Sequence, residues 1–212
     1  MPTKIPAVLG KQDVSVEMED DEGGPMSFAD VDADLKTRTI FLSGDITETT
    51  WHSFLVVYRE LCATKKPITV ILNSGGGVES SGYAIYDLIR LSGVPTDIYV
   101  YGGAFSIAAA ILQAGRVRAM SPQSRFMIHN GTGCIGRVDF GAMASLGERV
   151  CRNLSQYHSV LMERATITLE ELVTLCNKEM FLTPEESIKM GFVDCIIGET
   201  PKTKVTKKGP RK

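Results

Sequence analysis

The segment YGGAFSIAAA, residues 101–110, joins an apolar run typical of a β-strand (97–101) to an apolar run typical of a helix (107–114). Its one hydroxyl, on Ser106, therefore falls where a buried strand is expected to turn into a buried helix. Backbone amides at such a junction can point at the group that the serine attacks. A small residue that lets a helix pack closely would give the same pattern, and the segment alone favours that structural role.

The composition indicates one globular domain with flanking tails. The chain has 212 residues, 43% of them hydrophobic, and a net charge of −2, so no overall field attracts nucleic acid or an anionic membrane. No apolar run is long enough for a membrane span, and the N-terminus lacks the pattern of a secretory signal. The five cysteines are scattered without a C-x-x-C pair, which argues against a disulfide framework or a zinc site. We expect a cytoplasmic protein without a membrane or nucleic-acid partner.

Both ends of the chain differ in composition from the middle. Residues 1–36 include an acidic run at 17–22 followed by Gly-Gly-Pro, and we expect a flexible arm there. Residues 199–212 are rich in Lys and Arg and are expected to form a flexible tail. A single folded domain is predicted over 37–198.

The first half of this domain alternates strand and helix patterns. A β-rich run at 38–44 precedes a capping-box pattern, with Asp45 as cap and Glu48 three residues later, and a helix with a periodic apolar face. His52 and Ser53 fall off that face and are expected at the surface. A buried strand at 67–72 ends in a glycine turn and is followed by a second helix. This alternation predicts an α/β fold with a parallel sheet and right-handed crossovers.

The glycine segment at 75–77 resembles nucleotide-binding loops only superficially. No Gly-Lys-Ser/Thr follows it, and Ser80 stands where a dinucleotide fingerprint needs its third glycine. What remains is a stretch of unobstructed backbone amides next to a helix start. Such amides suit an oxyanion or an extended peptide backbone.

The second half predicts a strand at 125–129 that carries His129 at its end, and then a glycine-rich segment at 130–136. A long helix is expected from about Asp139 to Arg164. Its apolar stripe is longer than one small core needs, which indicates packing against another subunit as well. His158 lies beside this stripe and is expected at the helix surface or an interface. Two further capped helices, starting at Thr168 and Thr183, precede a last strand at 192–197.

These positions could together hydrolyse an amide. That reaction needs a nucleophile, a base, a group that orients the base, and donors for the oxyanion. Ser106 is the candidate nucleophile and His129 the candidate base, although a structural histidine would fit the latter position equally well. The amides of Gly77 and Ile107 are the candidate oxyanion donors. The surroundings Ala-x-Ser-x-Ala differ from the G-x-S-x-G elbow of α/β-hydrolases.

Several segments between residues 40 and 197 resemble, in their order and spacing, the proteolytic subunit of the ATP-dependent Clp protease (ClpP), a family of serine peptidases. The segments are IFLSG (40–44), NSGGGV (73–78), IYD (85–87), AFSIA (104–108), SRFMIH (124–129), FLTPEE (181–186) and GFVD (191–194). The resemblance implies that Ser106 is the nucleophile, His129 the base, and the amides of Gly77 and Ile107 the oxyanion hole.

Two positions depart from the family pattern. Gly75 stands where the family usually has proline, which should loosen the glycine segment. The family's triad acid is an aspartate two residues before the Phe of FLTPEE, and here that position is Glu179. A glutamate can orient a histidine, but it is one methylene longer, so its backbone must lie further back. Asn177 is the nearest alternative, and Asp139 and Asp194 belong to other segments.

The resemblance also implies a ClpP/crotonase-like fold with a protruding handle helix and an assembly of two stacked heptameric rings around a chamber. Unfolded polypeptides would bind in extended form along two segments, through residues Gly75, Gly76, Val78, Gly131 and Thr132. A Clp-type AAA+ ATPase would deliver them. No metal and no cofactor are expected, because ATP is used only by that unfoldase.

Several alternatives remain open at this stage. The chain could be a weakly active or inactive structural subunit of a mixed ring, for which Gly75 and Glu179 leave room. It could be a phage peptidase for head maturation, and organelle stroma or infected bacterial cytoplasm would also suit it. An acyl-CoA enzyme of the related crotonase fold uses similar glycine loops, but has no role for the pair Ser106 and His129.

Overall fold

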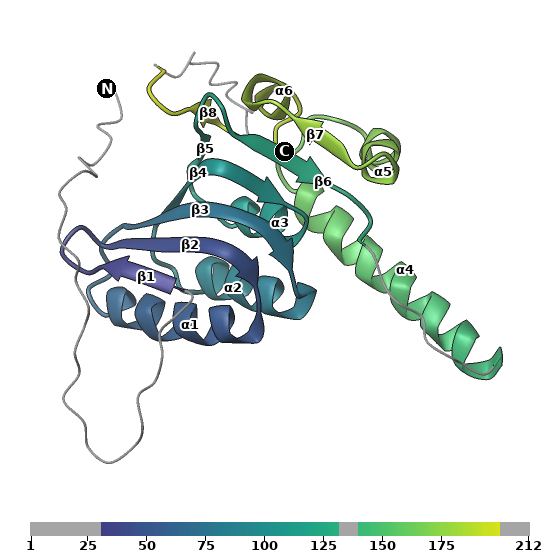
Figure 1. The fold of residues 1–212 in the computed structure, drawn as a ribbon, viewed down its shortest axis with the longest axis horizontal. Coiled ribbons are helices and arrows are strands. Elements are labelled where there is room, and N and C mark those ends of the chain that lie inside the picture. Colours follow the sequence, from purple (N-terminus) through teal and green to yellow (C-terminus); the bar gives the residue numbers. More distant parts are fainter. Residues whose placement is uncertain (1–30, 132–139, 200–212) are drawn as a thin grey trace, which may run out of the picture.

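The computed structural model describes residues 31–131 and 140–199 (Figure 1). Within them the chain forms one eight-stranded sheet and six helices. The strands are β1 (Val31–Asp34), β2 (Thr39–Ile46), β3 (Ile68–Gly77), β4 (Thr96–Phe105), β5 (Arg118–Met120), β6 (Arg125–Ile128), β7 (Met180–Leu182) and β8 (Cys195–Ile196). The helices are α1 (Glu48–Cys62), α2 (Glu79–Leu91), α3 (Ile107–Gln113), α4 (Phe140–Met162), α5 (Leu169–Asn177) and α6 (Pro184–Lys189).

The centre of the sheet is parallel and two of its outer pairs are antiparallel. The main path runs β1-β2-β3-β4-β5-β8, with only β1–β2 antiparallel. Strand β4 pairs with β5 along its first half and with β6 along its last three residues, and β6 in turn pairs antiparallel with β7. The predicted α/β fold with repeated strand–helix units and a parallel sheet is therefore confirmed.

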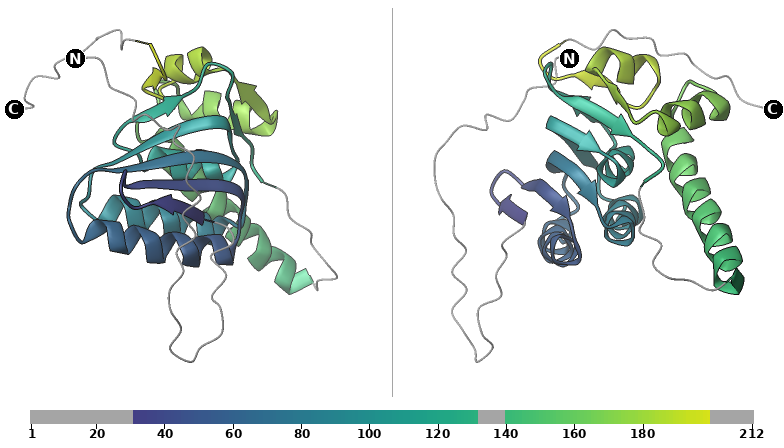
Figure 2. Two further views of the ribbon diagram at one scale, coloured as in Figure 1. Left: turned by 60° about the vertical axis from the view of Figure 1, so that its left-hand side comes forward. Right: turned by 45° about the vertical axis from the view of Figure 1, so that its right-hand side comes forward.

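Helices α1, α2 and α3 cover one face of the sheet, as the right-hand view of Figure 2 shows. Helix α3 is apolar apart from Gln113, and all seven of its residues are buried, because α3 packs against the sheet and is also in contact with α2 and α4. The strand that precedes α3 is buried on one face, where Ile98, Val100 and Ala104 are fully buried, whereas Tyr101 is exposed. The junction at Ser106, which is itself half-buried, thus lies at the border of the packed core.

Ordered structure begins earlier than the sequence indicates. Strand β1 lies inside the segment 1–36 that was expected to be a flexible arm, and its Val31 pairs with Leu42 of β2 and is buried. The expectation is therefore wrong for these four residues, because pairing with β2 satisfies their backbone. Residues 1–30 and 200–212 are outside the described part, so the rest of the arm and the tail remain predictions.

The start of α1 also differs from the expected capping box. Strand β2 continues through Asp45 and Ile46, so Thr47 rather than Asp45 is the N-cap. The Thr47 hydroxyl accepts a hydrogen bond from the Thr50 amide, and the Thr50 hydroxyl accepts one from the Thr47 amide. His52 is exposed as expected, but Ser53 is buried on the inner face of the helix beside Phe54, where its small side chain fits.

The glycine segment is a continuation of β3 and not the expected turn. Asn73 pairs with Ser43, and after a register shift Gly76 and Gly77 pair with Asp45 and Ile46 of β2. The chain then enters α2 directly at Glu79. The glycines therefore present an extended backbone at the carboxyl end of the sheet, which is where open α/β sheets bind ligands.

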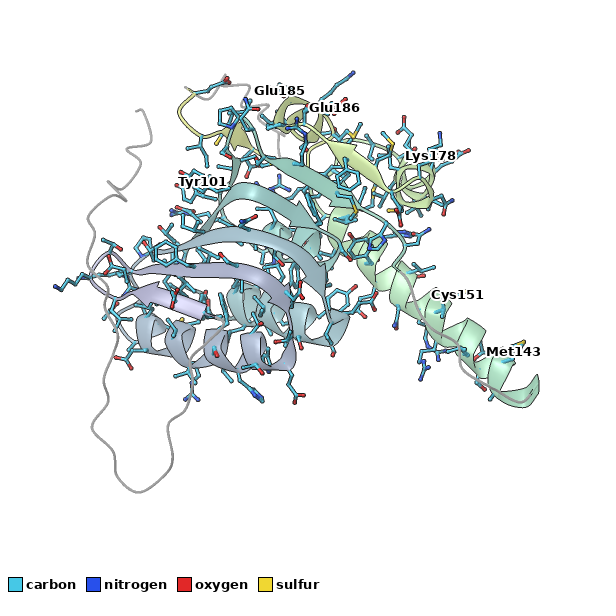
Figure 3. All side chains as sticks on the ribbon, viewed as in Figure 1. Tyr101, Met143, Cys151, Lys178, Glu185 and Glu186 are labelled. Carbon is cyan, nitrogen blue, oxygen red and sulfur yellow. The ribbon has the colours of Figure 1, made fainter. Side chains whose placement is uncertain are left out.

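Helix α4 projects away from the sheet (Figure 1), close to the expected bounds of 139–164. Its inner end packs on the body through buried Tyr157 and Leu161. Its outer part carries Met143 and Val150, which are 51% and 46% exposed. Figure 3 shows Met143 and Cys151 clear of the rest of the protein. The outer apolar stripe thus lacks a partner within the described residues, and its packing against another subunit stays a prediction.

Two smaller findings complete the fold. The last strand is shorter than expected, since only Cys195 and Ile196 of the run 192–197 pair with β5. In the described part of the chain, no helix is long and apolar enough to cross a membrane.

Candidate active site

Ser106 is the N-cap of α3 and directly follows β4. Its backbone angles are φ 54° and ψ −126°, a region that residues with a Cβ rarely adopt and that stores strain. The surrounding backbone fixes this conformation. The Ser106 amide donates to the carbonyl of Met127 (2.9 Å), and the Ser106 carbonyl accepts from the amide of Ala109 (2.9 Å) and the hydroxyl of Tyr157 (3.0 Å). A strained serine at a strand–helix junction is typical of a nucleophile.

His129 follows β6 and lies beside this serine. Because β4 and β6 run parallel, with Phe105 opposite Met127, the residues after each strand end up next to one another. The Nε2 atom of His129 lies 2.8 Å from Oγ of Ser106, across 23 residues of sequence. The distance is that of a hydrogen bond between a nucleophile and its base.

Glu179 lies on the other side of the imidazole. It precedes β7, whose antiparallel register places Met180 opposite Ile128 and therefore Glu179 opposite His129. Its Oε1 is 3.4 Å from Nδ1 of His129. A carboxylate there favours the tautomer with the proton on Nδ1, which leaves Nε2 to accept the serine proton. The histidine side chain is 15% exposed, whereas that of Glu179 is 62% exposed.

The other acid candidates have different partners. Asn177 accepts a hydrogen bond from Asn130. Asp194 forms ion pairs with Arg118 and Arg164, away from the imidazole. Asp139 is outside the described residues. Among the candidates in the described part of the chain, the structure brings only Glu179 to His129.

The glycine segment packs directly against the serine. Gly76 has φ +96°, and a Cβ built on it would lie 2.7 Å from Cβ of Ser106 and 2.8 Å from the carbonyl oxygen of Phe105. Gly77 has φ +147°, and a Cβ there would collide with the backbone of Ile46. At Gly75 nothing lies within 4 Å of such a Cβ. Glycine is thus required at 76, where the backbone approaches the nucleophile, and at 77, where it approaches β2. It is not required at 75.

The two candidate oxyanion donors are the backbone amides of Ile107 and Gly77. Ile107 is the first residue of α3, and the first amides of a helix have no partner within it. On the glycine strand, the amide of Val78 donates to Ile46 of β2. Since successive amides of an extended strand point to opposite sides, this favours an orientation of the Gly77 amide toward β4 and Ser106.

An open surface groove of about 400 Å³ runs along the same glycines. Its walls are Asp45, Ile46 and Thr47 from the end of β2 and residues 75–78 from the end of β3. Three of the residues expected to bind substrate, Gly75, Gly76 and Val78, therefore line this open groove. Gly131 follows the histidine with φ +77° and lies near Glu79, whose Oε1 would be 3.5 Å from a Cβ at this position. Thr132 is outside the described residues.

The remaining polar groups near the site have structural contacts. Nε2 of His158 lies 3.1 Å from Oδ1 of Asn130, and burial lowers the pKa of His158 below its usual value. His158 thus joins α4 to the residue after His129. No group of three or more His, Cys, Asp or Glu side chains within residues 31–131 and 140–199 could hold a metal ion.

Tyr157 is the residue near the nucleophile that the sequence does not single out. In the sequence it is one member of the apolar stripe of α4, and no neighbouring motif marks its hydroxyl. Its bond to Ser106 spans 51 residues and depends on how α4 packs beside α3.

Comparison with known proteins gives a consistent result. A family model described as Clp protease matches residues 23–200. The chain is 31% identical to ATP-dependent Clp protease proteolytic subunit 2 of Chlamydia trachomatis serovar D, over 80% of this chain and 85% of that protein. It is 30% identical to subunit 2 of Chlamydia pneumoniae and to subunit 1 of Chlamydia felis, with the same coverage.

Proposed function

The chain belongs to the Clp protease family, with the ClpP/crotonase-like fold and the serine peptidase class of that family, and from this premise we propose that Ser106, His129 and Glu179 form its catalytic triad. The observation that carries the proposal is the 2.8 Å contact between Oγ of Ser106 and Nε2 of His129, made at a strained helix start. With Glu179 as the acid, the three residues occur along the chain in the order nucleophile, base, acid.

The reaction follows from the geometry. Oγ of Ser106 attacks the carbonyl carbon of a peptide bond while Nε2 of His129 takes the hydroxyl proton. The amides of Gly77 and Ile107 donate to the oxyanion that forms. The imidazolium then gives its proton to the leaving amine, which departs and leaves an acyl-serine. Water, deprotonated by the same imidazole, hydrolyses this ester and restores Ser106.

Glu179 stabilises the imidazolium during both halves of the cycle. Its charge lies 3.4 Å from the ring nitrogen that does not contact the serine. Because the carboxylate is mostly exposed, water screens this interaction and we expect it to contribute less than a buried acid would.

The substrate of the proposed enzyme is an unfolded polypeptide. It would lie extended along Gly75, Gly76 and Val78, and against Gly131 and Thr132 on the other side. Glycines offer backbone hydrogen-bonding groups without side chains, so recognition through them depends little on sequence. The products would be short peptides.

We further infer an assembly of stacked heptameric rings that encloses these sites, loaded by a Clp-type AAA+ ATPase in the cytoplasm. The exposed Met143 and Val150 on α4 support contacts between subunits. The names of the similar Chlamydia proteins describe an ATP-dependent protease, which supports a partner that hydrolyses ATP. The peptidase chain itself needs no cofactor in this proposal.

A fluorophosphonate probe tests the central claim, because it phosphonylates only an activated serine. We expect the purified oligomer to be labelled at Ser106 and to cleave unstructured peptides, and Ser106→Ala to abolish both. An assembled oligomer without an adduct would instead indicate a structural subunit of a mixed ring. Unchanged peptide cleavage by Ser106→Ala would refute the proposed nucleophile.

A further inference from the structure

We propose that the hydroxyl of Tyr157 orients the oxyanion donor at Ile107 through the peptide bond between Ser106 and Ile107. Tyr157 would thus be a positioning residue, since it contacts neither the substrate nor the reacting atoms. The inference rests on the proposed peptidase function and adds to it a residue outside the triad and the oxyanion hole.

The contact itself is short and enclosed. The Tyr157 hydroxyl donates a hydrogen bond of 3.0 Å to the carbonyl oxygen of Ser106. The tyrosine is only 6% exposed. Burial raises its pKa well above the usual value. The phenol therefore keeps its proton, and remains a donor, throughout the pH range in which proteases work.

The geometry of the peptide unit connects this bond to the oxyanion hole. The carbonyl of Ser106 and the amide of Ile107 belong to one planar, trans peptide group, so they point in opposite directions. A donor that fixes the carbonyl on one side consequently fixes the direction of the N–H on the other. Holding this plane amounts to holding ψ of Ser106, which is −126°.

The rest of Ser106 is anchored as well. Its own amide donates to Met127 at 2.9 Å, and its carbonyl also accepts from Ala109 at 2.9 Å. The Ala109 bond belongs to the first turn of α3 and would by itself allow the peptide plane to tilt with that turn. Tyr157 belongs to α4, so its hydrogen bond holds the Ser106 carbonyl from a second direction that does not move with the first turn of α3.

The same bond also strengthens the donor. A hydrogen bond accepted by a peptide carbonyl polarises the peptide group and makes its N–H a better donor, an effect of about 10–30% per bond. The fixed orientation of the Ile107 amide and its greater donor strength both stabilise the oxyanion more than the planar carbonyl of the substrate. The reason is that only the oxyanion carries the negative charge. Loss of the Tyr157 hydroxyl should therefore lower kcat and leave KM nearly unchanged.

A purely structural role makes a different prediction. The buried ring fills space between α3 and α4, and phenylalanine would fill it equally well. Without the hydroxyl, the Ser106 carbonyl still accepts from Ala109, so no buried acceptor is left unpaired. A structural tyrosine would thus tolerate Tyr157→Phe without loss of activity.

The test compares Tyr157→Phe with Tyr86→Phe in the full-length oligomer. The hydroxyl of Tyr86 donates to Glu163, the residue directly after α4, at 2.6 Å, so this control also removes a phenol bond near the end of α4, but not one to the nucleophile. Peptide hydrolysis gives kcat and KM. A peptide boronate, whose tetrahedral adduct on Ser106 places an oxygen on the oxyanion donors, gives the affinity for a transition-state analogue, and a cleaved product peptide gives the ground-state affinity.

For Tyr157→Phe we expect kcat and boronate affinity to fall about 10-fold, which is less than the 10²–10³-fold loss for removal of a whole oxyanion donor. Product affinity and KM should stay within about twofold, and Tyr86→Phe should behave as the wild type. Unchanged kcat and boronate affinity in Tyr157→Phe, or an equal loss in Tyr86→Phe, would overturn the inference.

A second variant covers the case in which Tyr157→Phe fails to assemble. Replacing Tyr157 by 3-fluorotyrosine nearly retains the shape and makes the phenol a slightly stronger donor that burial keeps protonated, so boronate affinity should be at least that of the wild type. Weaker binding would count against the inference. A wild-type oligomer without Ser106 labelling would refute the proposed function and this inference together, whereas a labelled wild type with an unaffected Tyr157→Phe variant would refute the inference alone.

Discussion

Oε1 of Glu179 lies 3.4 Å from Nδ1 of His129, and the glutamate adopts a left-handed backbone with φ 49°. The antiparallel pairing of β6 and β7 places these two residues opposite each other. The longer side chain does not prevent the contact, and the carboxylate is mostly exposed at this point. Glu179 is therefore in position to orient the histidine, from a more solvated environment than a buried acid would have.

We predict that Glu179→Gln lowers kcat about 10–100-fold, because the amide neither favours the tautomer with the proton on Nδ1 nor stabilises the imidazolium. The loss should be smaller than the roughly 10⁴-fold reported for a buried triad aspartate. Hydrolysis of a fluorogenic peptide measures it. Glu185→Gln, on the exposed first turn of α6, is the matched control and should be fully active. Full activity of Glu179→Gln would remove Glu179 from the triad.

Substitution of neighbouring glycines should have opposite outcomes. Gly76→Ala places a methyl group 2.7 Å from Cβ of Ser106 at φ +96°, so we expect a destabilisation of roughly 1–3 kcal/mol and a loss of fluorophosphonate labelling. Gly75→Ala meets nothing within 4 Å and should keep labelling at the wild-type rate. The small probe is preferred here because a methyl group at 75 could contact a bound peptide. Similar labelling of both variants would contradict the predicted role of Gly76.

Asp194 should stabilise the fold through Arg118, whose side chain is only 3% exposed. The carboxylate accepts from the Arg118 amide, Nε and a terminal nitrogen, and also pairs with Arg164. Asp194→Asn leaves the Arg118 charge buried without its counterion, and we expect a loss of about 3–5 kcal/mol in the free energy of unfolding. Urea unfolding measures the loss. Asp97→Asn, which removes the partner of the more exposed Arg116, should cost at most about 1 kcal/mol.

The same pair sets a pH dependence. Burial of Asp194 tends to raise its pKa, but the hydrogen bonds and charge of Arg118 outweigh burial, and the net pKa is lowered. The stabilisation is therefore fully present above the unfolded pKa of about 3.9 and is lost as the pH falls through the lower folded value. The difference in unfolding free energy between wild type and Asp194→Asn should thus be constant from pH 7 to about 5 and shrink below about 4. A difference that shrank already near pH 6 would contradict this assignment.

The exposed stripe of α4 should be needed for assembly. Met143→Glu combined with Val150→Glu places two charges on apolar side chains that are about half exposed in the single chain, and we expect the stacked assembly to separate into smaller species. Sedimentation velocity measures the change. The control Met143→Leu with Val150→Ile keeps the surface apolar and should assemble normally. An unchanged particle size for the glutamate pair would place the subunit interface elsewhere.

Much of the fold could be predicted from local patterns. The apolar runs at 67–72 and 97–101 became the central strands β3 and β4, and the Thr-x-x-Glu patterns at Thr168 and Thr183 cap α5 and α6 as expected. Local signals were less reliable at the boundaries. Asp45 looked like a cap but is held in β2 by pairing with β3, and β1 carries too weak a pattern to stand out from the preceding acidic segment.

Local sequence patterns specify the alternation of strands and helices and mark Ser106 and His129, because a buried element needs a continuous apolar run and a functional side chain then stands out at its end. Which backbones meet depends on the packing of the whole chain. The parallel register of β4 and β6 sets the 2.8 Å between serine and histidine. The packing of α4 beside α3 gives the Ser106 carbonyl its second donor, Tyr157. Such contacts join residues 23 and 51 positions apart, and they depend on packing that no local pattern encodes.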